Sequence, residues 1–137
     1  MNDHGVSAVD HIGIAVRSLA QAGKFYEDLG IPSAGGEEVA EQKVRVAFYP
    51  AGESRVELLE STDPEGPIGR FVEKKGPGLH HIALRVGDLE ATLKNLAARG
   101  YDLIDKVPRA GAGNHRIAFV HPRATGGVLL ELVEERP

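Results

Sequence analysis

The alternation of apolar and polar positions predicts the same succession of elements twice along the chain. Residues 9–16 are rich in β-branched side chains and alternate apolar with other residues, which is typical of a half-buried strand. A helix is expected next, because Ser18 is a good N-cap and Gly30 is a good C-terminal stop. Three strand-like segments follow, at 36–41, 43–50 and 54–60, with a tight turn at 51–53. The first half therefore predicts the order βαβββ.

The second half repeats the first at an offset of 70 residues. The stretch from His11 to Leu19 aligns with the stretch from His81 to Leu89, and Gly30 aligns with Gly100 in the same register. Asp88 is expected to cap the second helix. Three further strands are expected at 102–107, 115–121 and 127–134. One register that carries a strand, a helix and its glycine stop indicates an internal duplication.

These elements predict an α+β fold with two tandem βαβββ modules, at about 8–62 and 78–135, in one domain over 1–137. The proline-containing linker, 63–77, is expected to hold a short helix near 68–74. Each module has a single sheet whose open face needs cover, so the two modules are expected to form one curved mixed sheet around a cleft that holds a metal ion.

Composition narrows the functional class. Of 137 residues, 42% are apolar and 26% charged, as in a soluble globular protein. No apolar run approaches the ~18 residues of a membrane span, and the first residues lack a secretory pattern. The absence of cysteine excludes thiolate ligands and favours a cytoplasmic enzyme. A net charge of −4 and 5% aromatic residues argue against nucleic acid as a partner.

The chemistry is expected at two His/Glu couples. His11 and His81 occupy the same position of the duplicated first strand, and Glu57 and Glu131 each lie within an apolar last strand. A carboxylate at a core-facing position is costly unless a positive charge pairs with it. Two imidazoles and two carboxylates suit one divalent ion of the Mn²⁺, Co²⁺, Fe²⁺, Ni²⁺ or Zn²⁺ type. A single strand histidine is more often a core residue, and a single strand glutamate more often faces solvent, but their repetition favours a metal site.

Several stretches resemble a known family. They are 9–16, 41–48, 55–60, 78–83, 121–122 and 126–132, and together they extend over nearly the whole chain from about residue 8 to 134. The sequence is similar to the vicinal oxygen chelate superfamily and, within it, to the methylmalonyl-CoA epimerases. A glycine-rich hairpin is expected at 111–116. It departs from the family pattern, because Asn114 and His115 stand where Gly-Lys or a similar pair is expected.

The resemblance implies an enzyme that moves the C2 proton of methylmalonyl-CoA through a metal-stabilised thioester enolate. It implies His11, Glu57, His81 and Glu131 as metal ligands, although some members have glutamine at the position of Glu57. It also implies Glu41, expected at the start of a strand, as the acid/base group on one face, with Glu131 considered for the other. An acyl-CoA substrate, Co²⁺ as the metal and a homodimer are expected.

Three alternatives use related scaffolds. A glyoxalase I-type lyase acting on a glutathione hemithioacetal would use much the same ligands, and the stretch around Glu41 favours the epimerase over it. An extradiol dioxygenase needs open positions for O₂ and a catechol, which Glu57 as a fourth protein ligand would reduce. A non-catalytic small-molecule-binding protein of the same fold would need no matched His/Glu couples.

Overall fold

The computed structural model describes residues 5–135, which form two compact units. One unit is His11–His80. The other runs from His81 to the end of the described range and includes the described residues up to Asp10. Among the described residues, no helix is long and apolar enough to cross a membrane. The α+β class and the two βαβββ modules are confirmed.

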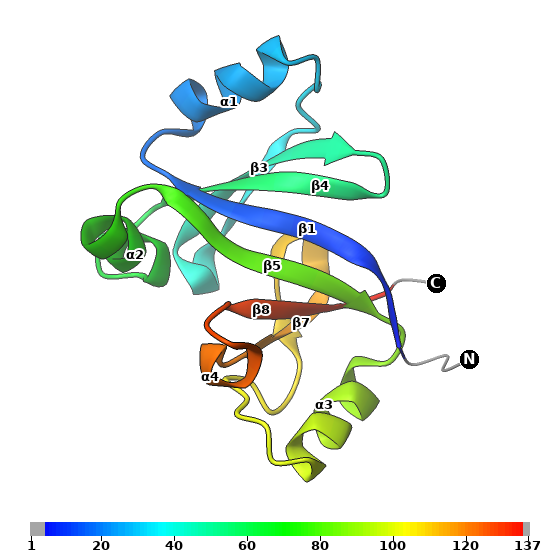
Figure 1. Ribbon diagram of the computed structural model, residues 1–137. Helices are drawn as coiled ribbons and strands as arrows, with labels where there is room; N and C mark the ends of the chain where they lie inside the picture. Colours follow the sequence, from blue (N-terminus) through cyan, green and yellow to red (C-terminus); the bar gives the residue numbers. More distant parts are fainter. Residues whose placement is uncertain (1–4, 136–137) are drawn as a thin grey trace. The chain divides into compact units, whose positions relative to one another are not determined.

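The His11–His80 unit holds a four-stranded mixed sheet in the order β2-β3-β4-β1. β1 and β4 are parallel, and the other two pairings are antiparallel. One face of this sheet carries α1 over a core that includes Val16, Tyr49 and Leu58 (Figure 1). The elements are β1 (Val6–Val16), α1 (Leu19–Asp28), β2 (Gly36–Val39), the 3₁₀ turn η1 (Ala40–Gln42), β3 (Val44–Ala51), β4 (Ser54–Ser61) and α2 (Pro67–Lys75).

The second unit repeats this arrangement with the order β5-β8-β7-β6, in which β5 and β8 are parallel. Helix α3 covers a core around Leu89, Leu93 and Leu132. A smaller cluster on the opposite face includes Phe119 and Val133. The elements are β5 (Gly78–Val86), α3 (Leu89–Ala98), β6 (Arg109–Ala110), the 3₁₀ turn η2 (Ala112–Asn114), β7 (Arg116–Val120), α4 (Pro122–Thr125) and β8 (Leu130–Glu134).

The predicted helix boundaries are confirmed. Ser18 accepts a hydrogen bond from the Gln21 N–H, and Asp88 accepts one from the Ala91 N–H. A second acceptor comes from the last strand of each half, because Glu60 accepts from the Leu19 N–H at 2.8 Å and Glu134 from the Leu89 N–H at 3.1 Å. These carboxylates satisfy amides that a helix start leaves without an intrahelical partner. The start of α1 is therefore hydrogen-bonded to β4, and the start of α3 to β8.

Three predicted boundaries are wrong. The strand expected at 36–41 ends at Val39, and Glu41 lies in η1 instead of at a strand start, because Lys43 adopts a left-handed conformation at φ 53°. The strand expected at 102–107 is reduced to one bridge at Leu103, because the Asp105 carboxylate takes the Phe119 N–H at 2.9 Å. The strand expected at 127–134 begins only at Leu130, after a short helix and two glycines with positive φ.

The fold gives a test at Gly23, where α1 approaches β3. A Cβ at this position would lie 2.2 Å from the Tyr49 hydroxyl oxygen. We expect Gly23→Ala to lower the free energy of unfolding by about 1–3 kcal/mol through overpacking, although alanine favours a helix by about 1 kcal/mol. Urea unfolding of the two proteins shows whether the free energy of unfolding falls or rises.

The control for Gly23→Ala is the double variant Gly23→Ala/Tyr49→Phe, compared with Tyr49→Phe alone. Phenylalanine lacks the hydroxyl that the new methyl group would meet. The cost of the alanine should therefore shrink in the Tyr49→Phe background. An alanine that destabilises both backgrounds equally would contradict the packing described for this helix.

Candidate metal centre

The second-half couple consists of His81 on β5 and Glu131 on β8, two strands that pair in parallel. The register places Ala83 opposite Glu131. His81 lies two residues before Ala83 and therefore on the same face of the sheet. The His81 Nε2 atom lies 3.1 Å from Glu131 Oε1. Parallel pairing and the two-residue period of the strand thus bring imidazole and carboxylate together on the face opposite α3.

The first-half couple has the same construction. Gly13 lies opposite Glu57 in the parallel pair of β1 and β4, and His11 is again two residues earlier. The His11 Nδ1 atom lies 3.3 Å from Glu57 Oε2. The four residues are between 2% and 6% exposed. The structure therefore brings the predicted residues together as two buried couples, one in each half.

An aromatic ring stands beside each carboxylate. The antiparallel partner of Glu57 is Phe48, and that of Glu131 is Phe119. The Phe119 ring also meets the His81 imidazole edge to face, with the centroids 5.9 Å apart. The carboxylates thus lie between apolar neighbours, where an uncompensated negative charge is costly.

Arg55 distinguishes the first couple from the second. Its Nε and Nη2 atoms each lie 2.7 Å from Glu57 Oε2, and its guanidinium lies 5.6 Å from the centroid of the Phe48 ring. Leu129 occupies the corresponding position, two residues before Glu131. The two-residue period of β4 places Arg55 on the same face as Glu57, but the sequence does not predict their ion pair because Arg55 has no counterpart in the second half.

A third buried carboxylate belongs to Asp10, which precedes His11. Arg85 Nε donates to Asp10 Oδ1 at 3.0 Å, and both residues lie in the same compact unit. Asp10 offers a carboxylate oxygen that could also serve a metal ion. Its carboxylate is paired with Arg85, as that of Glu57 is paired with Arg55, but unlike the His/Glu couples Asp10 has no equivalent in the other half.

Glu41 is exposed in η1, and within residues 5–135 its side chain makes no hydrogen bond or ion pair. Its role stays a prediction. The next residue was missed by the sequence analysis, since the Gln42 Nε2 atom is buried without a hydrogen-bond partner among the described residues. An unsatisfied buried donor calls for a partner, and no pattern in the sequence distinguishes Gln42 from its neighbours.

The donor set fits a divalent transition metal. Imidazole nitrogens and carboxylate oxygens are buried on rigid strands, and the described residues include histidine and acidic groups that could hold an ion. In each couple, the contact between histidine and glutamate involves one of the two carboxylate oxygens. A cation would offset the cost of burying these acids.

Comparison with known proteins identifies the superfamily of the chain. A family model of the glyoxalase/bleomycin resistance protein/dioxygenase superfamily matches residues 10–119. An uncharacterised Bacillus subtilis protein is 47% identical over 132 residues, which are 96% of this chain and 94% of that protein.

Two solved structures extend the likeness to the whole fold. The crystal structure of methylmalonyl-CoA epimerase from Mycobacterium tuberculosis superposes with a TM-score of 0.93 at 37% identity, covering 100% of this chain and 93% of that one. A methylmalonyl-CoA epimerase in complex with methylmalonyl-CoA and NH₄⁺ has a TM-score of 0.90 at 33% identity and covers 96% of each chain. The resemblance seen in the sequence is confirmed.

The ion pair of Arg55 with Glu57 gives a test that needs no metal. Arg55→Gln leaves a buried carboxylate without its strongest cationic partner, so we expect the metal-free protein to lose about 3 kcal/mol of unfolding free energy. Arg70→Gln is the control, because Arg70 forms a pair with Glu65 in which both side chains are exposed. That change should stay within about 1 kcal/mol. Equal effects of the two variants in urea unfolding would show that the Arg55 pair contributes no more than a surface contact.

Proposed function

The chain belongs to the glyoxalase/bleomycin resistance protein/dioxygenase superfamily and, within it, to the methylmalonyl-CoA epimerase family; we propose that it interconverts the two C2 epimers of methylmalonyl-CoA. The observation that carries this proposal is the pair of buried His/Glu couples, built by the same parallel register in both halves. A related epimerase structure holds methylmalonyl-CoA itself.

We propose that His11, Glu57, His81 and Glu131 together hold one divalent ion, with Co²⁺ as the expected metal. Their burial and their mixed nitrogen and oxygen donors support this assignment. The two carboxylates would balance the two positive charges of the ion, and the two neutral imidazoles would add no charge. When bound, the ion would supply positive charge near the thioester oxygen, which becomes more negative as C2 loses its proton.

Inversion at C2 requires a proton to leave one face and return to the other, so two acid/base groups are needed. We assign one face to Glu41, whose carboxylate is exposed and makes no ion pair among the described residues. Glu131 is the candidate for the other face. Its lone pairs are shared with His81 and with the proposed ion, which makes it the weaker base of the two.

The proposal includes a cytoplasmic homodimer. The lack of cysteine supports the cytoplasm, and the family resemblance supports the dimer. Light scattering of the purified protein measures the assembly: twice the 14.6 kDa chain mass is expected, and a monomer would contradict the dimer.

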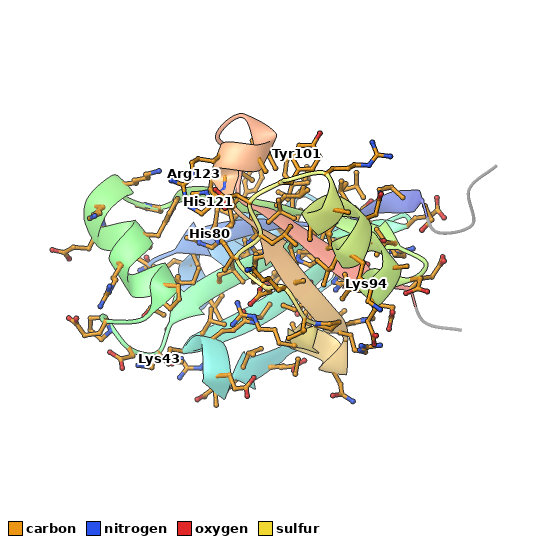
Figure 2. The ribbon with its side chains drawn as sticks, turned by 90° about the horizontal axis from the view of Figure 1, so that it is seen from below. Lys43, His80, Lys94, Tyr101, His121 and Arg123 are labelled. Carbon is orange, nitrogen blue, oxygen red and sulfur yellow. The ribbon has the colours of Figure 1, made fainter. Side chains whose placement is uncertain are left out.

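The reaction is tested by exchange of the C2 proton in D₂O. We expect deuterium to enter methylmalonyl-CoA with the metal-loaded enzyme, and to be lost with a chelator or in His81→Ala. His121→Ala is the control, because His121 caps α4 and belongs to neither couple (Figure 2). An enzyme that isomerises a glutathione hemithioacetal but leaves methylmalonyl-CoA unlabelled would be a glyoxalase-type lyase instead.

The role of Glu41 is tested by Glu41→Gln, which keeps the shape of the side chain and removes its basicity. Metal content and folding should be retained, while kcat falls by about 10² to 10⁴. Glu38→Gln is the control, since Glu38 is also exposed and lies in neighbouring β2. Measuring C2 exchange from each epimer separately shows which face is affected. Wild-type turnover in folded, metal-loaded Glu41→Gln would remove Glu41 from the mechanism.

A further inference from the structure

The guanidinium of Arg109 lies over the ring of Phe119, the phenylalanine beside the couple of His81 and Glu131. Its guanidinium carbon lies 5.2 Å from the centroid of the Phe119 ring, in the geometry of a cation–π contact. The imidazole of His81 meets the same ring edge to face, at a centroid distance of 5.9 Å. One phenylalanine therefore separates Arg109 from a proposed metal ligand, and all three residues lie in the same compact unit.

Asp105 fixes the position of this guanidinium. The Asp105 Oδ2 atom accepts a hydrogen bond from the Phe119 N–H at 2.9 Å and lies 3.3 Å from Arg109 Nε. The Asp105 side chain is 17% exposed, whereas that of Arg109 is 41% exposed. The Asp105 carboxylate thus holds Arg109 in place while the arginine side chain as a whole stays partly exposed. A side chain positioned in this way is ordered before a ligand arrives.

The two halves use their arginines differently. In the first half, Arg55 also lies over a phenylalanine, Phe48, but its guanidinium contacts the carboxylate of the couple at 2.7 Å. Within the described residues, Arg109 makes no such ion pair with Glu131. Arg109 pairs with Asp105 instead, so the carboxylate of the couple does not occupy its guanidinium.

We propose that Arg109 binds the free carboxylate of the acyl-CoA and so determines specificity, an inference that rests on the proposed epimerase function. An exposed guanidinium matches a carboxylate with paired, charge-assisted hydrogen bonds. In methylmalonyl-CoA this carboxylate is attached to C2, the carbon that loses its proton. The phosphates of CoA are the other anions, but the pantetheine arm separates them from C2. Arg109, one ring away from His81, therefore suits the carboxylate.

The test compares two ligands that differ only in that carboxylate, methylmalonyl-CoA and propionyl-CoA. Their Kd values are measured by calorimetry on the metal-loaded wild type, Arg109→Gln, Arg109→Lys and Arg123→Gln. Arg123 is the matched control, because it pairs with an aspartate in the same unit but is 73% exposed and lies on α4 (Figure 2). Metal content and thermal unfolding of each variant are measured alongside.

We expect Arg109→Gln to weaken methylmalonyl-CoA binding by about 10- to 100-fold, the loss typical of a hydrogen bond to a charged group. Propionyl-CoA binding should stay unchanged, Arg109→Lys should recover part of the loss, and Arg123→Gln should match the wild type. Equal weakening of both ligands would indicate a phosphate contact and overturn the proposal, as would no weakening of either. A wild type that leaves C2 unlabelled in D₂O would instead overturn the epimerase function, whatever Arg109 does.

Discussion

The structure depends on the parallel pairing of the first and last strand in each half. This pairing sets Gly13 opposite Glu57 and Ala83 opposite Glu131, so that the histidine two residues earlier shares a face with the carboxylate. A slip of one residue would turn each glutamate towards the helix-covered core. The residues opposite the two carboxylates are the smallest ones, glycine and alanine. Register, helix packing and site are therefore coupled.

Burial of the two glutamates makes their negative charge costly. Glu57 and Glu131 are almost fully buried between apolar neighbours, where a carboxylate is stable only with a compensating charge. The first half supplies part of that charge through Arg55, but the second half has Leu129 at the matching position. The duplicated halves have thus kept their histidines and glutamates while their cations differ. Arg109 fits this difference, since it lies over Phe119, the ring that also meets His81, and among the described residues its ion pair is with Asp105 and not with Glu131.

The duplication made the main features predictable from sequence. The offset that aligned His11 with His81 also aligned the helix caps, so the βαβββ order followed from local patterns, and the family resemblance supported it. The ion pairs of Asp10 with Arg85 and of Arg55 with Glu57 were missed, because they occur once and leave no repeated signal. The strand expected at 102–107 does not form, because the Phe119 N–H donates to the Asp105 carboxylate instead of to a backbone carbonyl. The periodicity of the sequence does not reveal such a side-chain acceptor. Glu41 was recognised through the family alone, and its place in a 3₁₀ turn depends on the left-handed Lys43.

The central claim is that the two couples serve one ion together. Calorimetric titration of the metal-free protein with Co²⁺ tests it most directly, in the wild type, His11→Ala and His81→Ala. The account predicts one ion per chain in the wild type. It also predicts that the affinity for Co²⁺ falls by more than about 100-fold in either variant. That loss is larger than the one expected for a residue that only hydrogen-bonds to a metal ligand. Two ions per chain, or full affinity in one of the variants, would show that the couples bind metal separately and would contradict the account.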